Sequence, residues 1–239
     1  MKIKDLHPWD QITPAEARKI QEELRSLIIL EDSISIEDIR LVAGIDNAYV
    51  KDGQSTIALA VIVILTFPAL EIVETQTANC PIRFPYIPGL LAFREAPAIL
   101  MACRLIENEP DVILFDGQGY AHFRRMGLAS HLGLVLDQPS IGCAKSRLLG
   151  KYIEPEKALG SYSPLEEDEE EIGAAVRTRP THSPLFVSPG HKISITSAVA
   201  ITLACCQENH FMPEPTRLAH TLVNEQAQAY RQQIQAQQK

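Results

Sequence analysis

The sequence lacks the long apolar stretches of membrane proteins and the paired cysteines of many secreted ones. No apolar run reaches the roughly 18 residues of a membrane span, and the N-terminal stretch MKIKDLHPWD has no signal-peptide core. The five cysteines are odd in number and show no Cys-x-x-Cys spacing, which disfavours a zinc site or a disulfide framework and favours buried, reduced thiols. These absences predict a soluble, cytoplasmic protein without a membrane partner.

Basic residues are too few to balance the acidic ones. The 22 lysines and arginines face 30 aspartates and glutamates, a net charge of −8 that alone speaks against a nucleic-acid partner. Six of the acids stand together at 166–171, as EEDEEE, and removing their six charges from −8 leaves −2. We expect this acidic run to be a solvated loop or the tip of a hairpin.

A basic cluster occupies the middle of the chain. The local charge, and not the total, decides whether a phosphate can bind, so this cluster keeps a nucleic-acid partner open. Its members are Arg124, Arg125, Lys145, Arg147 and Lys151.

Internal repeats and linkers rich in Pro, Gly or Ser are also absent. With 239 residues, one domain spanning residues 1–239 is the simplest organisation. Its last stretch, residues 226–239, is rich in Gln and Ala and is expected to fray. A monomer is the default expectation.

The stretch DVILFDGQGYAHFRRMGLASHLG, residues 111–133, is the one around which the chain is organised. Residues 112–115 form a continuous apolar run typical of a strand buried on both faces. The run ends at Asp116, and Gly117 and Gly119 follow, whose lack of a Cβ lets the backbone pass close to a ligand. From this stretch alone two interpretations have equal weight: Asp116 serves a metal or phosphate site, or it caps the next segment.

Turn and capping signals divide the rest of the chain. Thr13-Pro14-Ala15-Glu16 is typical of a helix start, with Thr as the cap and Glu three residues after it. Asp52-Gly53 is a hairpin signal, and the two prolines within 84–89 predict a stiff loop. We expect helices at 14–28, 90–107, 127–136, 194–206 and from 213, strands at 40–50, 56–67, 70–77, 112–115 and 140–143, an additional strand pair at 172–178 and 184–188, and a turn at 189–191.

The order strand, strand, strand, helix, strand brings three acids together. A strand reached through a helical crossover is normally parallel to one already in the sheet, so strand 112–115 should lie beside strand 40–50. Asp46 and Asp116 would then be neighbours, and Glu95, early in the crossover helix, can lean over the same point. Three carboxylates at one place repel one another unless a cation neutralises them, and oxygen ligands suit Mg²⁺ or Mn²⁺.

Such a site supports hydrolysis of a phosphodiester, because the metal polarises the phosphate and lowers the pKa of the attacking water. The order of elements and the placement of the acids are those of a ribonuclease-H-like arrangement. We therefore predict a single α/β domain with a mixed sheet flanked by helices. Its core would be five mostly antiparallel strands, with peripheral additions.

Six motifs make the assignment specific. They are FPYIPGLLAFREAP, DVILFDGQGYAH, GLASHLG, IGCAKSRLLG, PLFVSPGH and PEPTRLAH. They resemble the endonuclease V family of deoxyinosine-directed repair nucleases, and the resemblance runs from Trp9 to Leu222. It implies a Mg²⁺-dependent enzyme, with Mn²⁺ as a substitute, that flips deoxyinosine out of damaged DNA. It also implies hydrolysis of the second phosphodiester 3′ to the lesion, leaving 3′-hydroxyl and 5′-phosphate ends.

The resemblance assigns catalytic roles to five residues. Asp46, Glu95 and Asp116 would be the metal-binding acids, and His220, in RLAH, would act as base or acid or orient the metal's water. Lys145 would hold the scissile phosphate or offset charge in the transition state. Without the family, a helical histidine is expected to be packed or solvent-facing, and a loop lysine to be solvated.

The resemblance also predicts how DNA is bound. A stiff loop would enter the base stack and separate the strands, and this wedge consists of Pro85, Tyr86, Ile87 and Pro88. The extruded base needs a pocket, and the residues expected to form it are Gly89, Leu91, Gly117, Gly119 and His122. Backbone groups exposed at the glycines could select hypoxanthine, but turn geometry also accounts for glycines there.

Two alternatives stay open. Some family members prefer RNA, so an endonuclease that cuts single-stranded RNA at inosine would carry the same motifs. A lesion-binding protein without turnover is disfavoured, because a pure binder has no reason to gather three acids that repel one another. The motifs also contain His131, Ser188 and His191, to which the resemblance assigns no role.

Overall fold

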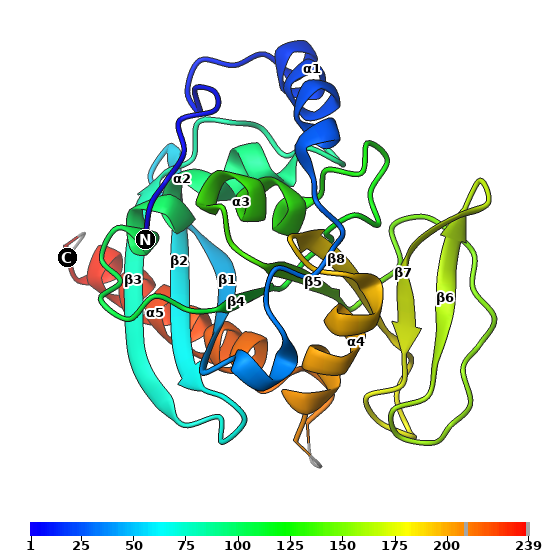
Figure 1. Cartoon of the computed structure of the whole chain (residues 1–239). Coiled ribbons are helices and arrows are strands. Elements are labelled where there is room, and N and C mark those ends of the chain that lie inside the picture. The colour runs from blue at the N-terminus through cyan, green and yellow to red at the C-terminus, as the bar shows by residue number, and fades with distance from the viewer. Residues whose placement is uncertain (208–209, 238–239) are drawn as a thin grey trace.

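A single eight-stranded sheet runs through the protein and orders its other elements (Figure 1). The computed structural model describes residues 1–207 and 210–237. Along the sheet the strands follow the order β3-β2-β1-β4-β5-β8-β7-β6. Their bounds are β1 Leu41–Asp52, β2 Ser55–Thr66, β3 Ile72–Pro81, β4 Val112–Phe115, β5 Ser140–Ala144, β6 Tyr162–Glu167, β7 Glu170–Val176 and β8 Leu185–His191.

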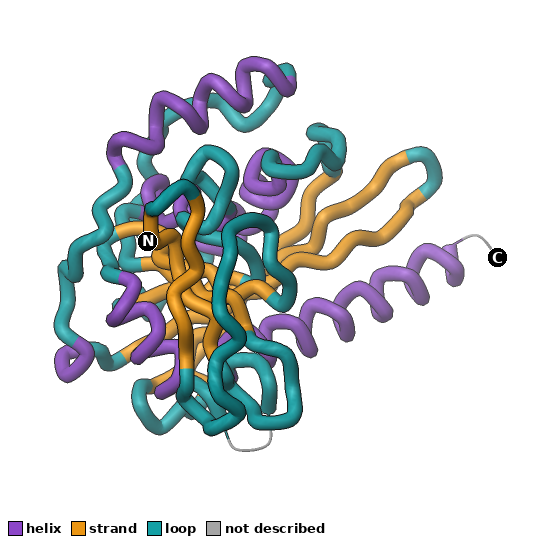
Figure 2. The backbone as a smooth tube through the Cα atoms, turned by 90° about the vertical axis from the view of Figure 1, so that its right-hand side faces the viewer, coloured by secondary structure: helices purple, strands orange, loops and turns teal. Residues whose placement is uncertain are grey.

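Helices cover both faces of this sheet. α2 and α3 contribute to the apolar core on one face, and α4 and α5 to the core on the other. In Figure 2 the long helix α5 is seen lengthwise along the strands. No helix among the described residues is both long and apolar enough to cross a membrane. The bounds are α1 Pro14–Leu24, α2 Leu91–Cys103, α3 Leu128–Leu136, α4 Ile195–Ala204 and α5 Glu214–Gln237, with 3₁₀ turns at Arg25–Leu27 and Ile36–Asp38.

β1 alternates between the two cores. Val42, Ala48 and Val50 face the core shared with α5, whereas Ala43 and Ile45 face the core shared with α2. Successive side chains of a strand point to opposite faces. Residue 46 therefore faces α5, and residues 47 and 49 face α2.

The predicted α/β fold, with a mixed sheet flanked by helices, is confirmed. Thr13 caps α1 in a capping box with Glu16, and β1 and β2 form the predicted hairpin. β4 lies beside β1 and parallel to it, with Ile45 opposite Phe115. The carboxyl end of β4 therefore lies beside the middle of β1, next to Asp46.

The second half of the chain differs from the predictions at two places. β7 and β8 are the predicted additional strand pair and continue the sheet beyond β5, but the outer strand β6 has no counterpart among the predicted strands. Residues 189–191 are not a turn but the end of β8, where Pro189 lies opposite Ile141 beside a register shift. Proline is tolerated at such an irregularity, because the ladder does not need its missing N–H there.

The C-terminal tail is helical where fraying was predicted. α5 continues without a break to Gln237, and Ala227, Tyr230 and Ile234 pack against the core. Helices in proteins are stabilised mainly by the packing of an apolar face. These three residues, three and four positions apart, form such a face within a Gln-rich sequence. Residues 238–239 lie outside the described part of the chain.

The acidic run forms the tip of the β6–β7 hairpin, one of the two forms predicted for it. Asp168 and Glu169 make the turn with φ values of 52° and 67°, in the left-handed region that hairpin turns require. One acid of the run, Glu170, also binds protein groups, because it accepts hydrogen bonds from the Tyr120 hydroxyl (2.6 Å) and from Arg125 Nε (2.8 Å). The hairpin is thereby attached to the loop that follows β4.

The start of α5 passes so close to β1 that Gly44 has no room for a side chain. A Cβ there would lie 2.0 Å from the carbonyl carbon and oxygen of Pro215, and backbone atoms cannot turn aside. We expect Gly44→Ala to lower the free energy of unfolding by about 1–3 kcal/mol, as overpacking does, in chemical denaturation.

Gly53→Asn is the control for this substitution. Apart from its chain neighbours, no atom of the described residues lies within 4 Å of a Cβ at Gly53, and Asn tolerates its φ of 57° better than most residues do. Its stability should stay within about 0.5 kcal/mol of the wild type. Equal losses in both variants would show that contact with Pro215 is not the cause.

Candidate active site

Two carboxylates and an imidazole meet where β4 ends beside the middle of β1. Asp46 lies within β1, Asp116 directly follows β4, and His220 projects from α5. One possible ligand atom of each lies within 4.8 Å of the others, and His220 Nδ1 is 2.7 Å from Asp46 Oδ2. The parallel pairing of β1 with β4 brings the two acids together, and α5 adds the histidine.

Glu95 approaches this acidic cluster from the other face of the sheet. Its helix, α2, packs on the face opposite α5, and Glu95 is not among the three grouped residues. Its Oε1 accepts a hydrogen bond from the Tyr49 hydroxyl, and its backbone carbonyl accepts one from Asn47 Nδ2 (3.5 Å). Two of the three predicted carboxylates therefore lie in the group with His220. Tyr49, which has no motif signal, holds the third, Glu95, near them.

The acids resist ionising together. Burial raises the pKa of Asp46, and the charge of Asp116 raises it further, while the hydrogen bond with His220 opposes both effects. Burial also raises the pKa of Glu95 to about 7, against the hydrogen bond from Tyr49 and together with the charges of Asp46 and Asp116. Such shifts mark a place where negative charge is uncompensated. Two carboxylates, an imidazole and a third carboxyl nearby are a donor set that fits a divalent cation.

Lys145 supplies positive charge to the same place. It follows β5, the neighbour of β4, and its Nζ lies 2.6 Å from Asp116 Oδ2. The lysine stem is long and flexible and its ammonium is a compact charge. Lys145 can therefore exchange Asp116 for another anion without movement of the backbone.

The imidazole of His220 is held on both sides. Nδ1 faces Asp46, and the side-chain nitrogen of Asn224, one turn further along α5, lies 3.3 Å from Nε2. The same nitrogen donates to the backbone carbonyl of His220 (2.8 Å). Because an amide nitrogen only donates, Nε2 accepts, and the ring proton sits on Nδ1 and is donated to Asp46.

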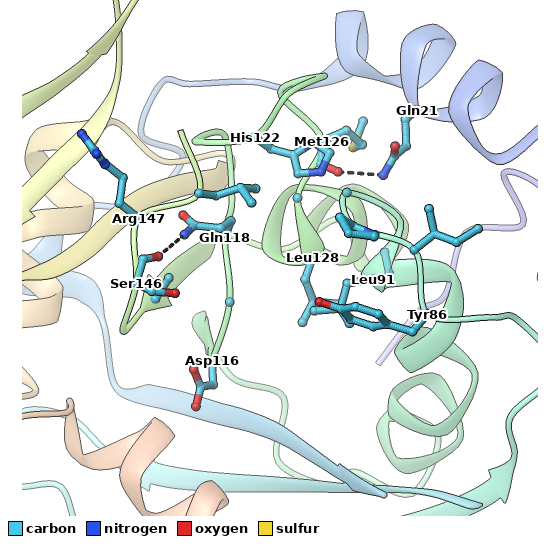
Figure 3. Close-up of a pocket in the computed structure, with 18 of the residues that line it drawn as sticks. Gln21, Tyr86, Leu91, Asp116, Gln118, His122, Met126, Leu128, Ser146 and Arg147 are labelled. Atoms are coloured by element: carbon cyan, nitrogen blue, oxygen red, sulfur yellow. Dashed lines mark hydrogen bonds between the residues drawn. The ribbon is translucent and has the colours of Figure 1, made fainter. Parts of the chain in front are cut away.

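A pocket of about 400 Å³ opens beside these acids (Figure 3). Asp116 and Lys145 belong to its wall, so the pocket and the acidic cluster share residues. The basic loop after β5 also contributes to the lining, with Ser146 and Arg147. Gln118 Nε2 donates to the Ser146 carbonyl (2.9 Å) and joins this loop to the one after β4.

Most of the residues predicted to bind DNA lie at this pocket. Its lining includes four of the predicted base-pocket residues, Gly89, Leu91, Gly117 and His122. The predicted wedge also lines it, through Tyr86, Ile87 and Pro88 but not through Pro85. Burial, together with Arg124, lowers the pKa of His122 to about 4. The imidazole is therefore neutral at pH 7 and can both donate and accept a hydrogen bond.

Gly119, the fifth residue predicted for the base pocket, is not among the residues that line it. A Cβ there would lie 2.3 Å from the Pro189 carbonyl oxygen of β8, and its N–H donates to Ser188 Oγ (2.9 Å). Gly119 is needed because β8 passes too close for a side chain, and Ser188 bonds the backbone at that contact. At Gly117 a Cβ would meet only the Leu128 side chain, at 3.4 Å.

Helix α1 closes the pocket with Gln21, a residue that the sequence does not single out. Gln21 is 1% exposed, its Nε2 donates to the Met126 carbonyl (3.0 Å), and its Oε1 accepts from Arg124 Nε (2.7 Å). Arg124 Nη2 also donates to the Gly89 carbonyl (2.8 Å) and ties the two walls of the pocket together. Arg124 of the basic cluster, like Arg125 on Glu170, therefore binds protein groups.

The wedge presents an exposed aromatic ring from a fixed loop. Tyr86 is 70% exposed and lies at the pocket in Figure 3. The loop is anchored on both sides of it, because Phe84 and Ile87 belong to the apolar cluster under α1. Arg94 Nη1 donates to the Phe84 carbonyl (3.0 Å). A ring held this way loses little conformational entropy on insertion.

Two of the unassigned motif histidines serve packing. His131 is fully buried, its Nε2 lies 2.7 Å from Nε2 of His7, and its ring contacts those of Trp9 and Phe93. Nδ1 of His191, also buried, accepts a hydrogen bond from the Ile29 N–H (3.3 Å). Neither histidine lines the pocket.

Known proteins resemble this chain along nearly its whole length. The family model described as Endonuclease V matches residues 22–221. An endonuclease V of Nostoc sp. is 47% identical over 224 residues, which are 94% of this chain and 99% of that protein. The crystal structure of endonuclease V from Bacillus subtilis covers 98% of this chain and 100% of its own, with a TM-score of 0.93 and 33% identity.

One solved relative contains nucleic acid. It is endonuclease V of Ciona intestinalis in complex with a 24-mer DNA containing an inosine followed by a ribo-adenosine. It is 30% identical, has a TM-score of 0.79, and covers 90% of this chain and 98% of its own.

A pair of alanine substitutions separates packing from pocket contact at the two glycines. Gly119→Ala places a methyl group against the β8 backbone and should cost about 1–3 kcal/mol of stability. Gly117→Ala meets only a side chain at ordinary distance, so it should leave the unfolding midpoint within the usual surface range, about 0.5 kcal/mol. Denaturant unfolding of both variants tests this, and the reverse ranking would restore Gly119 to the pocket.

Proposed function

The chain belongs to the endonuclease V family of nucleases, and from this premise we propose that it repairs DNA by hydrolysing the second phosphodiester 3′ to a deoxyinosine. The products would carry 3′-hydroxyl and 5′-phosphate ends. The observation that carries the proposal is that Asp116 belongs both to the acidic cluster and to the pocket wall. A base extruded into the pocket would leave its own backbone beside the acids. The inosine-containing DNA bound by the Ciona relative supports the choice of lesion.

The metal site would be formed by Asp46, Glu95 and Asp116, with Mg²⁺ as the cation and Mn²⁺ as a substitute. When bound, the cation would polarise the phosphate and lower the pKa of the attacking water. The raised pKa values of Asp46 and Glu95 support this assignment, because both acids are buried beside like charge.

Two further groups would act on the substrate directly. His220 is half exposed on the Asp46 side of the cluster, and because its Nδ1 proton is donated to Asp46, Nε2 is the ring nitrogen that would accept or return a proton. Lys145 would turn from Asp116 to the scissile phosphate, since a cation on Asp116 competes for the same oxygen. Its ammonium would offset charge that develops on the phosphate.

The wedge and the pocket would recognise the lesion together. Tyr86 would take the place of the extruded base in the stack, and its anchored loop keeps the ordering cost low. Hypoxanthine would lie between Gly89 and Leu91 on one wall and Gly117 and His122 on the other. Gly89 has a φ of 79° and its Cβ would lie 3.0 Å from Arg124 Nη2, so this wall tolerates no larger residue without strain.

Metal removal tests the activity on a DNA duplex with one deoxyinosine. We expect a cut one nucleotide beyond the lesion on its 3′ side with Mg²⁺ or Mn²⁺, and none with EDTA. Asp46→Ala should lower the single-turnover rate by at least about 100-fold, because it removes a ligand of the site. Binding without cutting by the wild type in either metal would overturn the DNA nuclease assignment.

The same assay with matched inosine-containing single-stranded RNA distinguishes the alternative substrate. A faster cut of the RNA under competition would assign the chain to the RNA-directed branch and leave the acids in the same roles.

Tyr86→Ala tests the wedge. Stacking on an aromatic ring contributes about 1–3 kcal/mol per base, so the rate on duplex deoxyinosine should fall by roughly 5- to 150-fold. Single-stranded substrate needs no strand separation and should lose much less. Tyr162→Ala removes an exposed ring from β6 and is the control. An equal loss on both substrates would remove the strand-separating role.

A further inference from the structure

Tyr49 lies three residues beyond Asp46 in β1 but on the opposite face of the strand. Its ring packs against the core shared with α2, and its hydroxyl donates to Glu95 Oε1. Glu95 is 8% exposed, so its carboxylate has few other partners. A buried carboxylate with one hydrogen bond from a fixed donor has its orientation set by that donor.

The hydrogen bond uses only one oxygen of Glu95. Oε1 accepts from Tyr49, and Oε2 takes part in no hydrogen bond or ion pair recorded among the described residues. A carboxylate held by one oxygen can offer the other to a cation while keeping its orientation, as in the outer-shell pairs common at metal sites. This arrangement lets Glu95 serve the cluster from the α2 face.

The ring of Tyr49 is itself fixed. The guanidinium carbon of Arg94 lies 4.9 Å from its centroid, and the same side chain donates to the Phe84 carbonyl at the start of the wedge loop. Arg94 and Glu95 are adjacent in α2. The same turn of this helix therefore contacts the face of the Tyr49 ring through Arg94 and its hydroxyl through Glu95. The donor is therefore pre-organised.

We propose that Tyr49 is the positioning residue of the metal site, which orients the Glu95 carboxylate through Oε1 and leaves Oε2 for the cation. The inference rests on the proposed function in one respect, namely that Glu95 is a metal ligand. Tyr49 touches neither the substrate nor the reacting atoms, and acts through Glu95.

The test measures Mn²⁺ affinity in the absence of DNA, by calorimetric titration of the full chain. Tyr49→Phe keeps the ring under Arg94 and removes only the hydroxyl. Loss of an outer-shell partner typically weakens metal binding by about 10- to 100-fold, and we expect a loss in that range. Tyr230→Phe is the matched control, because its hydroxyl faces Asp52 (3.5 Å), at the end of the same strand and outside the cluster. It should bind Mn²⁺ like the wild type.

A double-mutant cycle separates positioning from general damage. Glu95→Gln should weaken Mn²⁺ binding by itself, and adding Tyr49→Phe to it should weaken it no further, because the hydroxyl then has no ligand to orient. The same additional loss in both backgrounds would overturn the proposal, as would wild-type affinity of Tyr49→Phe.

Arg94→Lys provides a second variant that does not depend on the folding of the first. It keeps the positive charge but loses the planar contact with the ring, so Mn²⁺ binding should weaken by about 2- to 5-fold, the scale of an exposed cation–π contact. Unchanged affinity in this variant and in Tyr49→Phe would contradict the proposal. Failure of the wild type to bind Mn²⁺ would overturn the proposed metal site itself. That outcome is distinct from failure of the positioning role, in which the wild type binds Mn²⁺ and Tyr49→Phe binds it equally well.

Discussion

The parallel pairing of β1 with β4 is the constraint on which the site depends. It sets Asp46, within β1, beside Asp116, at the end of β4, where their charges repel and water cannot fully screen them. Because side chains alternate along β1, the two helices that pack on its opposite faces supply the other groups of the site. α5, on one face, brings an imidazole to Asp46, and α2, on the other, brings a carboxylate held by Tyr49.

The pocket and the wedge follow from hydrogen bonds that reach them from outside. Arg124 joins the two pocket walls and is itself held by Gln21 of α1, and Arg94 holds the backbone that leads into the wedge. These contacts make a rigid cavity out of loops, which are otherwise the most mobile parts of a fold. Because its walls are ordered before DNA binds, a site of this kind loses little conformational entropy on binding, and more of its binding free energy can offset the cost of extruding a base.

The sequence predicts the parts of this arrangement that depend on local pattern. The apolar run before Asp116 and the crossover through α2 were enough to place the two acids together, and the family motifs located the wedge and most of the pocket. The rest depends on tertiary contacts. From the sequence, Gly119 is interpreted as a ligand-binding glycine, but the structure shows that β8 packs against it. Gln21 lies in a helix whose apolar pattern does not indicate that it faces the pocket. The tail likewise becomes helical through packing against the core.

β6, one of the two strands at the margins of the sheet, has an outer edge that could pair with another polypeptide. Pro164, near its middle, has no N–H to donate. The backbone N–H and C=O of Glu166 are both hydrogen-bonded to the backbone of Lys151, in the preceding loop. The acids at the hairpin tip add a concentration of like charge that a second copy would have to approach. Each of these features blunts a sheet edge against intermolecular strand pairing. The run that contributes most of the chain's net negative charge therefore protects the protein against aggregation.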